Sequence, residues 1–260
     1  GGWMMIRMWL AGREIDPATG PGAVHPLVRW GEGLFETMRA GGGGIPLRDR
    51  HLDRLTGSLE ALTIPDPPSR GELAGAIAQL PAGDGRVRLT AAAERLIIAE
   101  HAPEAPISDE PRGLAGALMP GEWAPGRRVG EHKTVSYLGY RDAARRASLA
   151  GADVALLTDS HGRLGEADRG NLIATVDGEV RTPPVRGILP GIARAWALEW
   201  EGLGEAAIKS AEREEATEIV ICNAVDGFGS VTSVDGTTVG DGRPGPYARG
   251  AQARFAALFR

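Results

Sequence analysis

Short strand-like and helix-like segments alternate in the first part of this sequence, and that order limits the possible fold more than any other feature. Residues 5–15 are expected to form two short strands around a turn, and the second half of residues 30–39 alternates apolar and polar side chains, as a half-buried strand does. From residue 48 to 62, leucine recurs at every third or fourth position, which predicts one face of a helix. A second, alanine-rich helix is expected over residues 71–80, and a strand over 86–90.

The second half of the sequence is rich in turn signals placed between short apolar runs. Runs at 152–158 and 218–223 predict strands, whereas residues 140–150 and 191–202 predict helices. The dipeptide Asp177-Gly178 separates two further runs and is a strong hairpin signal. Strands interleaved with helices, followed by a hairpin-rich part, favour an α+β protein of two domains over a parallel doubly wound sheet.

A segment rich in proline, glycine and alanine lies between these halves, over residues 101–125. Such a composition is typical of a connection between domains. We therefore expect an N-terminal α/β domain over residues 1–113, a linker over 114–122 and a C-terminal domain over 123–260.

Composition argues against several classes of function. The formal net charge of −5 disfavours a broad attraction to nucleic acid or to an acidic membrane. No run of about 18 apolar residues occurs and no secretion signal is recognisable, so we expect neither a membrane span nor export. Cys222 is the single cysteine, which excludes an internal disulfide and favours a cytoplasmic location. Neither a GxGxxG following a strand nor a GxxxxGK[ST] occurs, so the common dinucleotide and P-loop interpretations fail.

Lysine is almost absent from this chain. Of the 29 basic residues only Lys133 and Lys209 are lysines, and the others are arginines. Arginine is always protonated, whereas lysine can lose its proton and attack a carbonyl group. Lys209 lies in a polar stretch and is explained by ordinary surface exposure. Lys133 is a candidate for a residue that arginine cannot replace.

Four short motifs follow one another along the chain. They are residues 51–55 (HLDRL), 132–138 (HKTVSYL), 163–172 (RLGEADRGNL) and 187–194 (GILPGIAR). Taken singly, the first three have ordinary explanations: a solvated arginine on a helix, a surface lysine beside a core tyrosine, and a solvated glutamate in a turn. Their order and spacing together favour a functional interpretation.

The four motifs resemble those of the class IV pyridoxal 5'-phosphate (PLP) enzymes of fold type IV, and the resemblance covers nearly the whole chain. This family includes branched-chain aminotransferases, D-amino-acid aminotransferases, (R)-amine transaminases and 4-amino-4-deoxychorismate lyases. The resemblance implies a small N-terminal α/β domain and a larger, β-barrel-like PLP-binding domain with flanking helices. It also implies a homodimer that needs no metal.

The resemblance gives the motif residues roles around the cofactor. Lys133 would carry PLP and move a proton during catalysis, and Glu166 would hold the ring nitrogen protonated. Arg54 would bind the phosphate, together with backbone N–H groups at a helix start. The other expected cofactor contacts are Tyr137 at the phenolic oxygen, Leu189 on the ring face, Ile192 and Ala193 at the helix start, and Ala224 near the phosphate.

The sequence departs from the family pattern around the expected substrate pocket. Ala193 replaces the usual threonine, and residues 168–169 replace small hydroxyl residues. An arginine usually found after an N-terminal strand is missing, so we expect the substrate carboxylate at Arg88 or Arg95 instead. Phe35 stands where D-amino-acid enzymes carry a tyrosine.

The same residues serve more than one reaction. The leading hypothesis is a transaminase that acts on a small-molecule amino donor, a D-amino acid or a primary (R)-amine, with a keto acid acceptor. The alternative is a 4-amino-4-deoxychorismate lyase, which eliminates pyruvate and gives 4-aminobenzoate. A hypothesis of another class is a non-catalytic relative that binds a metabolite.

Overall fold

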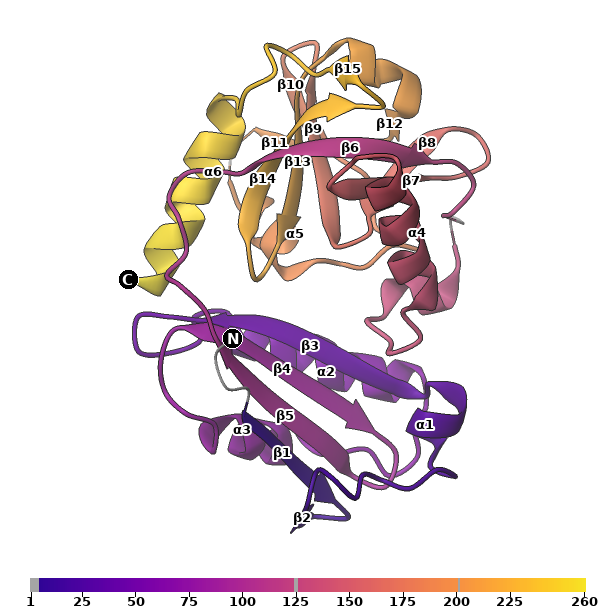
Figure 1. The fold of residues 1–260 in the computed structure, drawn as a ribbon, viewed down its shortest axis with the longest axis vertical. Helices are drawn as coiled ribbons and strands as arrows, with labels where there is room; N and C mark the ends of the chain where they lie inside the picture. The colour runs from indigo at the N-terminus through magenta and orange to yellow at the C-terminus, as the bar shows by residue number, and fades with distance from the viewer. Residues whose placement is uncertain (1–4, 124–125, 201) are drawn as a thin grey trace. The chain divides into compact units, whose positions relative to one another are not determined.

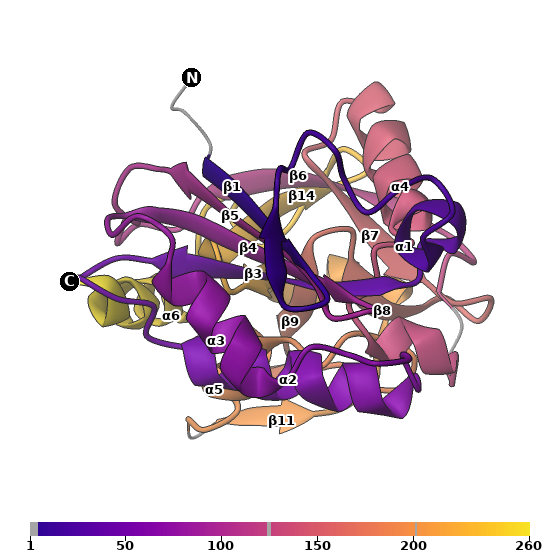
Figure 2. The same cartoon turned by 90° about the horizontal axis from the view of Figure 1, so that it is seen from below.

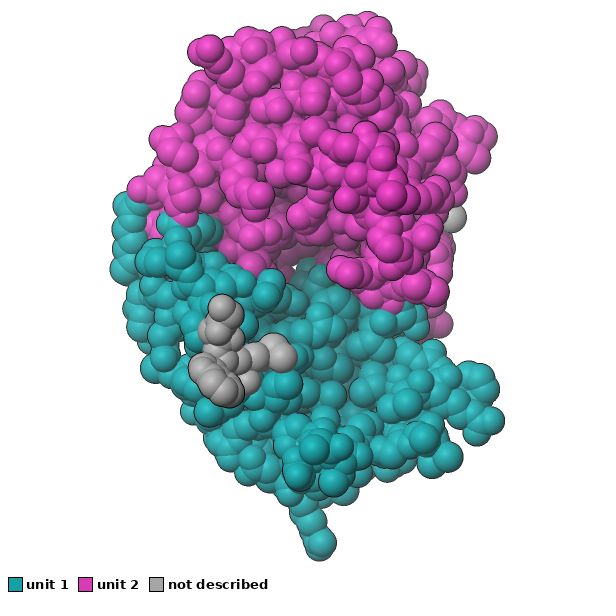
Figure 3. All heavy atoms as spheres, in the orientation of Figure 1, with its two compact units in different colours: residues 1–107, 132–136, 258–260 teal, residues 108–131, 137–257 magenta. Residues whose placement is uncertain are grey.

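The computed structural model describes residues 5–123, 126–200 and 202–260 (Figure 1). The chain divides into two compact units, which Figure 3 colours separately. Unit 1 holds Gly1–Ile107, His132–Ser136 and Leu258–Arg260, and unit 2 holds Ser108–Glu131 and Tyr137–Ala257. The short segment His132–Ser136 therefore belongs to unit 1, although the chain on both sides of it belongs to unit 2.

Unit 1 is an antiparallel five-stranded sheet in the order β2-β1-β5-β4-β3. Helices α2 and α3 cover one face of this sheet (Figures 1 and 2). The elements are β1 (Met5–Leu10), β2 (Arg13–Ile15), α1 (Pro26–Trp30), β3 (Gly33–Ala40), α2 (Arg48–Ala61), α3 (Arg70–Ala78), β4 (Gly85–Ala92) and β5 (Leu96–Pro103).

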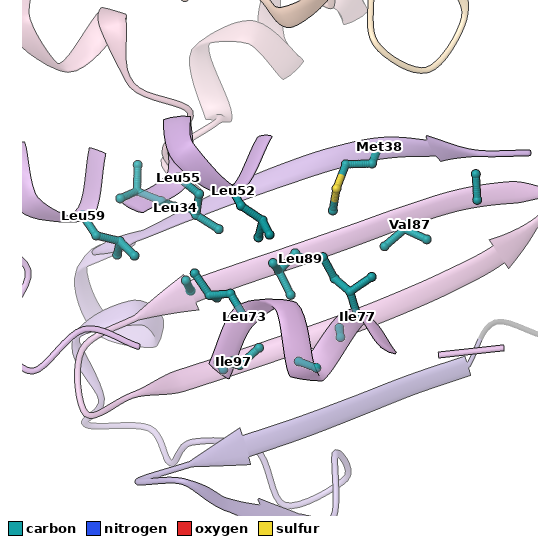
Figure 4. Close-up of a cluster of buried hydrophobic side chains, with 14 residues drawn as sticks. Leu34, Met38, Leu52, Leu55, Leu59, Leu73, Ile77, Val87, Leu89 and Ile97 are labelled. Carbon is teal, nitrogen blue, oxygen red and sulfur yellow. The ribbon is translucent and has the colours of Figure 1, made fainter. Parts of the chain in front are cut away.

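The leucine pattern predicted for residues 48–62 forms the packing face of α2. Leu52, Leu55 and Leu59 are buried against side chains from β3, β4 and α3 (Figure 4). Each fully buried leucine contributes about 2 kcal/mol of transfer free energy. Helix α3 begins at Arg70 because Ser69 and Glu72 form a capping box, in which each side chain accepts the other's backbone N–H.

Unit 2 is a larger, mostly antiparallel sheet with helices on its outside (Figure 1). Its elements are β6 (Gly113–Met119), η1 (Arg128–Glu131), α4 (Leu138–Leu149), β7 (Val154–Thr158), β8 (Arg163–Ala167), β9 (Gly170–Val176), β10 (Glu179–Thr182), α5 (Ile192–Ala197), β11 (Leu203–Glu205), β12 (Ile208–Lys209), η2 (Ser210–Glu214), β13 (Ala216–Asn223), β14 (Gly227–Val234), β15 (Thr237–Thr238), α6 (Pro246–Ala256) and η3 (Ala257–Phe259).

The large sheet closes on itself. Strands β9, β13, β14, β6, β7 and β8 pair in succession, and β8 pairs again with β9, which completes a six-stranded barrel. Closure leaves these six strands without a free end to the ring and encloses an apolar core. The α+β class and the barrel-like second part expected from the sequence are thus confirmed.

The structure corrects the linker that the sequence predicted over residues 114–122. Residues 113–119 are not an extended connection but strand β6, which pairs in parallel with both β14 and β7. Its glycines and alanines gave no strand signal, and the pairing partners come from distant parts of the chain. Gly116 packs closely here, since a Cβ atom would lie 3.1 Å from the Val231 side chain and 3.2 Å from the Leu156 side chain.

Two other predictions can be compared directly with the structure. Asp177 and Gly178 have φ angles of 52° and 76°, as the two central positions of a tight hairpin turn require, and they join β9 to β10. Strand β3, expected to be half buried, has nearly all of its residues buried on both faces.

Among the helices that the structure describes, none has both the length and the apolar character to cross a membrane.

Candidate active site

The segment that carries Lys133 is attached to the sheet of unit 1. The N–H of Phe35 donates to the carbonyl of Lys133 at 2.8 Å, and the N–H of Val135 donates to the carbonyl of Gly33 at 2.9 Å. Next to them, His132 Nδ1 lies 2.9 Å from Ser58 Oγ on α2. The segment therefore extends the sheet beyond β3, and the lysine backbone is fixed by contacts remote in sequence.

Lys133 and Arg88 are two cations that lie against the same aromatic ring. Lys133 Nζ is 4.6 Å from the centre of the Phe35 ring, and Arg88 Cζ is 3.7 Å from it. Arg88 also forms an ion pair with Glu100 at 3.5 Å. Arg95 contacts a different group of residues, since its Nη2 donates to the carbonyl of Ala11 at 2.8 Å. The structure thus groups Arg88, and not Arg95, with Phe35 and Lys133.

Arg54 is part of a buried cluster on α2 and β3. Its Nε and Nη2 donate to the two carboxylate oxygens of Glu36 at 2.7 and 2.6 Å, and His51 Nδ1 lies 2.7 Å from Glu36 Oε2. Burial raises the pKa of Glu36, but the charge of Arg54 and the hydrogen bonds from His51 and Arg54 outweigh it and lower the pKa to about 2. The bidentate pair fixes the plane of the guanidinium group.

Glu166 is a buried carboxylate on strand β8, not a solvated residue in a turn. It is 4% exposed. Its Oε1 accepts the hydroxyl of Tyr140 at 2.5 Å, and its Oε2 accepts the N–H of Leu189 at 3.2 Å. Glu166 pairs with Asn171 where β8 and β9 close the barrel, so the closure fixes its backbone position.

The segment before α5 is held against Glu166 and Asn171. Asn171 Nδ2 donates to the carbonyl of Leu189 at 2.9 Å. A Cβ atom on Gly191 would lie 1.8 Å from Asn171 Oδ1, so a side chain here would force Asn171 out of its present position. Ile192 and Ala193 are the first two residues of α5, where backbone N–H groups have no partner within the helix.

Ala224 and Asp168 occupy turns at the ends of barrel strands. Ala224 lies in the turn between β13 and β14, two residues beyond Cys222, which pairs with Asn171. Asp168 lies in the turn between β8 and β9, and its Oδ1 accepts the N–H of Ala155 on β7 at 2.9 Å. Burial raises the pKa of Asp168, although this hydrogen bond opposes the effect. The unusual Asp168 thus serves the barrel backbone.

Tyr137 donates from its hydroxyl to the carbonyl of Asp168 at 3.0 Å, and its ring stacks on that of Tyr140, with ring centres 4.7 Å apart.

The sequence analysis did not predict Tyr140 or Glu36 as residues of the site. The signal for Tyr140 was its position three residues after Tyr137, a spacing that can bring two rings together at the start of a helix. For Glu36 there was no signal, because a glutamate in an alternating strand is ordinarily solvated. Over the described ranges, no cluster of histidine, cysteine and acidic residues could hold a metal ion.

Solved structures with the same architecture define the fold. The branched-chain amino acid aminotransferase from Escherichia coli superposes with a TM-score of 0.84 at 22% identity, covering 97% of this chain and 94% of that one. Another branched-chain amino acid aminotransferase, solved with pyridoxamine 5'-phosphate, superposes with the same TM-score at 21% identity and the same coverage of both chains. A fold IV-transaminase from Curtobacterium pusillum superposes with a TM-score of 0.82 at 20% identity, covering 98% and 97%. The chain therefore has the fold type IV architecture that the motifs implied.

The sequence itself matches the model of the amino-transferase class IV family over residues 33–234, so this chain belongs to that family. A curated relative is the branched-chain-amino-acid aminotransferase-like protein 2 of Arabidopsis thaliana, 24% identical over 265 residues. The match takes in 89% of this chain but 46% of the relative, so the chain spans about half the length of that protein.

Family membership confirms PLP as the cofactor expected from the motifs. The residues present fit this group. Lys133 supplies a primary amine beside an aromatic ring, and Glu166 supplies a buried carboxylate with a fixed plane. The glycine at the start of α5 leaves room for Asn171, and the first turn of this helix has backbone N–H groups without a helical partner, which are of the kind that bind phosphate.

Proposed function

We propose that this chain is a PLP-dependent transaminase that moves an amino group from a donor with an apolar side chain to a keto acid. The observation that carries the proposal is the contact between Lys133 Nζ and the ring of Phe35 at 4.6 Å. An aromatic wall beside the reactive amine excludes water and favours an apolar substituent on the substrate.

The residues of each unit have separate tasks in this proposal. PLP, when bound, supplies a conjugated ring that takes up the electron pair released at the substrate carbon. Lys133 Nζ holds the cofactor and then carries the proton that leaves the substrate carbon. Glu166 would keep a proton on the ring nitrogen, Tyr137 would contact the phenolic oxygen, and Leu189 would pack on the face of the ring.

The phosphate contacts combine a side chain with backbone groups. Arg54 is proposed as one contact, with its guanidinium plane already fixed by Glu36. Since Glu36 balances the charge of Arg54, the backbone N–H groups of Ile192 and Ala193 and the turn at Ala224 are proposed to provide the rest of the site.

Arg88 is proposed as the contact for the substrate carboxylate. It lies over the ring of Phe35 on the face opposite to the packed helices, because Glu36 and Phe35 are neighbours on β3 and point to opposite sides of the sheet. Its ion pair with Glu100 is long, at 3.5 Å, and 38% of the Arg88 side chain is exposed. A carboxylate ligand could therefore compete with Glu100 for this guanidinium group.

The first experiment tests the cofactor and Lys133. We expect the purified protein to absorb near the visible range as a yellow PLP protein, and borohydride to fix the cofactor to the peptide that contains Lys133. Mass spectrometry of the digested protein identifies the site. Attachment at Lys209, or no attachment after incubation with PLP, would contradict the proposal.

The second experiment separates the substrates and the reactions. The names of the relatives favour branched-chain amino acids, whereas the leading hypothesis from the sequence was a D-amino acid or a primary (R)-amine. Keto-acid-dependent consumption of L-leucine, D-alanine and an (R)-amine should be compared under identical conditions. We expect at least one donor to support turnover.

The lyase alternative rests on the resemblance of residues 133–137 and 221–224 to the aminodeoxychorismate lyase branch. Release of pyruvate from aminodeoxychorismate, measured without any keto acid, reports that reaction alone. If only this assay responds, the transaminase proposal is wrong. If no assay responds while PLP is attached to Lys133, a non-catalytic relative is indicated.

We also propose a homodimer and a cytoplasmic location. Val28 and Trp30 on α1, together with Val24 just before it, are exposed apolar side chains, and α1 buries none of its residues. Apolar surface of this kind commonly marks a protein interface. The free thiol of Cys222 suits a reducing compartment. Light scattering at several concentrations tests the dimer, and a monomer throughout would contradict it.

A further inference from the structure

Tyr140 is the residue of unit 2 that most directly controls Glu166. Its hydroxyl donates to Glu166 Oε1 at 2.5 Å, while Oε2 accepts the N–H of Leu189 at 3.2 Å. A donor on each oxygen restricts the orientation of the carboxylate. Neither donor carries a charge, so both stabilise the ionised carboxylate without cancelling its charge.

The position of the Tyr140 hydroxyl is itself fixed. Helix α4, which begins at Leu138, packs on β6 and β7 (Figure 1). The rings of Tyr137 and Tyr140 stack with centres 4.7 Å apart and planes inclined by 25°. Tyr137 is anchored in turn by its hydrogen bond to the carbonyl of Asp168 at 3.0 Å. Tyr140 therefore reaches Glu166 from a rigid support.

The electrostatic surroundings keep Tyr140 a donor. Burial, followed by the negative charge of Glu166 and the hydrogen bond to it, raises the pKa of Tyr140 well above its ordinary value. Tyr137 acts in the same direction, and the positive charge of Arg127 opposes it. The backbone carbonyl of Asp168 accepts the Tyr137 hydroxyl, and the charges of Arg169 and Arg141 act on the Asp168 carboxylate.

We propose that Tyr140 is a positioning residue that keeps Glu166 ionised and aimed, so that a proton shared with a basic ring nitrogen stays on the nitrogen. Burial alone disfavours a charged carboxylate and would draw that proton to oxygen. Without the phenol, the proton moves from the nitrogen to Glu166, with no net gain or loss of protons. The part that concerns the ring rests on the proposed function, and the effect on Glu166 does not.

The test begins with the protein stripped of cofactor. Glutamate labelled with ¹³C at the carboxyl carbon lets the Glu166 signal be followed against pH, and Glu166→Gln assigns it. A hydrogen bond to a charged group is worth enough to change proton affinity about tenfold. We therefore expect Tyr140→Phe to move the Glu166 midpoint upward by about one pH unit. An unchanged midpoint would overturn the proposal.

Tyr247→Phe is the matched control. The Tyr247 hydroxyl is buried in the same unit and has no hydrogen-bond partner among the described residues. The same atom is removed, yet the Glu166 midpoint should not move. A movement as large as that in Tyr140→Phe would show a general packing effect and contradict the specific role.

A reciprocal variant keeps the inference testable if Tyr140→Phe folds poorly. In Glu166→Gln the phenol of Tyr140 loses its anionic acceptor, so it should titrate at lower pH than in the wild type, as followed with ¹³C-labelled tyrosine. No change in the Tyr140 titration would contradict the coupling.

The loaded enzyme then tests the consequence for the ring. In Tyr140→Phe, the ¹⁵N signal of the ring nitrogen of labelled PLP should move toward the unprotonated position. Turnover should fall about tenfold, and the dissociation constant for PLP should change less than threefold. A ring-nitrogen signal identical to that of the wild type would overturn the proposal. Failure of the wild type to bind PLP would instead contradict the proposed function, and the cofactor-free titrations would still decide the role of Tyr140.

Discussion

Each unit buries one carboxylate of functional interest, and the two are held in different ways. Glu36 in unit 1 is 1% exposed and meets the guanidinium group of Arg54 in a bidentate pair, with His51 on one of the same oxygens. Glu166 in unit 2 is 4% exposed and is held within that unit by a phenol and a backbone N–H. In both cases the hydrogen-bond donors stabilise the ionised carboxylate and so offset the cost of burying it.

The difference lies in what happens to the charge. The Arg54 cation compensates the charge of Glu36, so the loss of either partner would destabilise unit 1, and the pair orients Arg54. The two donors that Glu166 meets within its unit, the Tyr140 hydroxyl and the Leu189 N–H, are neutral, so they stabilise its negative charge without adding a positive one. A buried carboxylate that is paired with a cation, such as Glu36, has a structural role. One that is held by neutral donors, such as Glu166, suits the recognition of a cationic group such as a protonated ring nitrogen.

The largest effect is expected where unit 1 supplies the reactive amine. Lys133→Arg keeps a cation beside Phe35 but removes the amine that can lose a proton, so turnover should fall by a factor of about 10³ or more. Because the segment is held by backbone contacts at Phe35 and Val135, the melting temperature should change little. Steady-state rates and thermal unfolding measure the two effects. Turnover within tenfold of the wild type would show that the site lies elsewhere.

The second prediction compares the two carboxylates under the same substitution. Glu36→Gln leaves the cation of Arg54 buried without its counter-charge, so the free energy of unfolding should fall by about 3–5 kcal/mol. Glu166→Gln removes a charge held by neutral donors, and its cost should be about 1 kcal/mol, with a much larger loss of turnover. Urea unfolding of both variants measures the difference. Equal losses of unfolding free energy in the two variants would contradict the proposed difference between the two carboxylates.

The pH dependence of the free energy of unfolding provides a further test of the role of Glu36. The pKa of Glu36 falls from an ordinary 4.5 to about 2 in the folded protein. A lowered pKa stabilises the fold at pH values above 4.5, and this contribution is lost as the pH falls from 4.5 toward 2. The gap of about 2.5 between the two pKa values corresponds to about 3 kcal/mol. Urea unfolding between pH 6 and pH 2 should show this loss in the wild type and a flatter profile in Glu36→Gln. Parallel profiles would contradict it.

Local patterns in the sequence predicted the elements that depend on neighbours along the chain. The helix expected over residues 48–62 spans Arg48–Ala61, and the turn at Asp177-Gly178 joins the two expected strands. In both cases a local rule, leucine spacing or a preference for positive φ, determines the structure. The family motifs likewise predicted the cofactor and the fold type.

Features that depend on distant residues were not predictable from local patterns. Strand β6 has the composition of a linker and becomes a strand because β14 and β7 pair with it. The burial of Glu36 follows from Arg54 on a helix 18 positions away, and the attachment of Lys133 to β3 joins residues about 100 positions apart. Tyr140 could have been found, since it follows Tyr137 by three residues at the start of a predicted helix.

The fourth prediction separates the two candidate arginines of unit 1. Arg88→Ala should raise KM for an amino acid about tenfold or more, and should leave KM for a primary amine that lacks a carboxylate nearly unchanged. Arg95→Ala is the control, because Arg95 contacts Ala11 and Glu72 instead of Phe35. If Arg95→Ala alone raises KM for the amino acid, the carboxylate contact has been assigned to the wrong residue.

The smallest effect concerns how the segment His132–Ser136, which carries Lys133, is attached to the sheet of unit 1. Ser58 is buried, and its Oγ lies 2.9 Å from His132 Nδ1, next to the lysine. Ser58→Ala removes this hydrogen bond and should lower the free energy of unfolding by about 1 kcal/mol. The backbone pairing should open more often, so the amide hydrogens of Phe35 and Val135 should exchange with solvent several times faster.

Thr56→Ala is the matched control for this last effect, because it also removes a hydroxyl from α2. The Thr56 hydroxyl donates to the carbonyl of Leu52 within the same helix and does not contact the lysine segment. Exchange at Phe35 and Val135 should therefore match the wild type. If Ser58→Ala leaves this exchange unchanged as well, the backbone pairing alone holds Lys133 in place. The contact between Ser58 and His132 would then be a consequence of the attachment and not a cause of it.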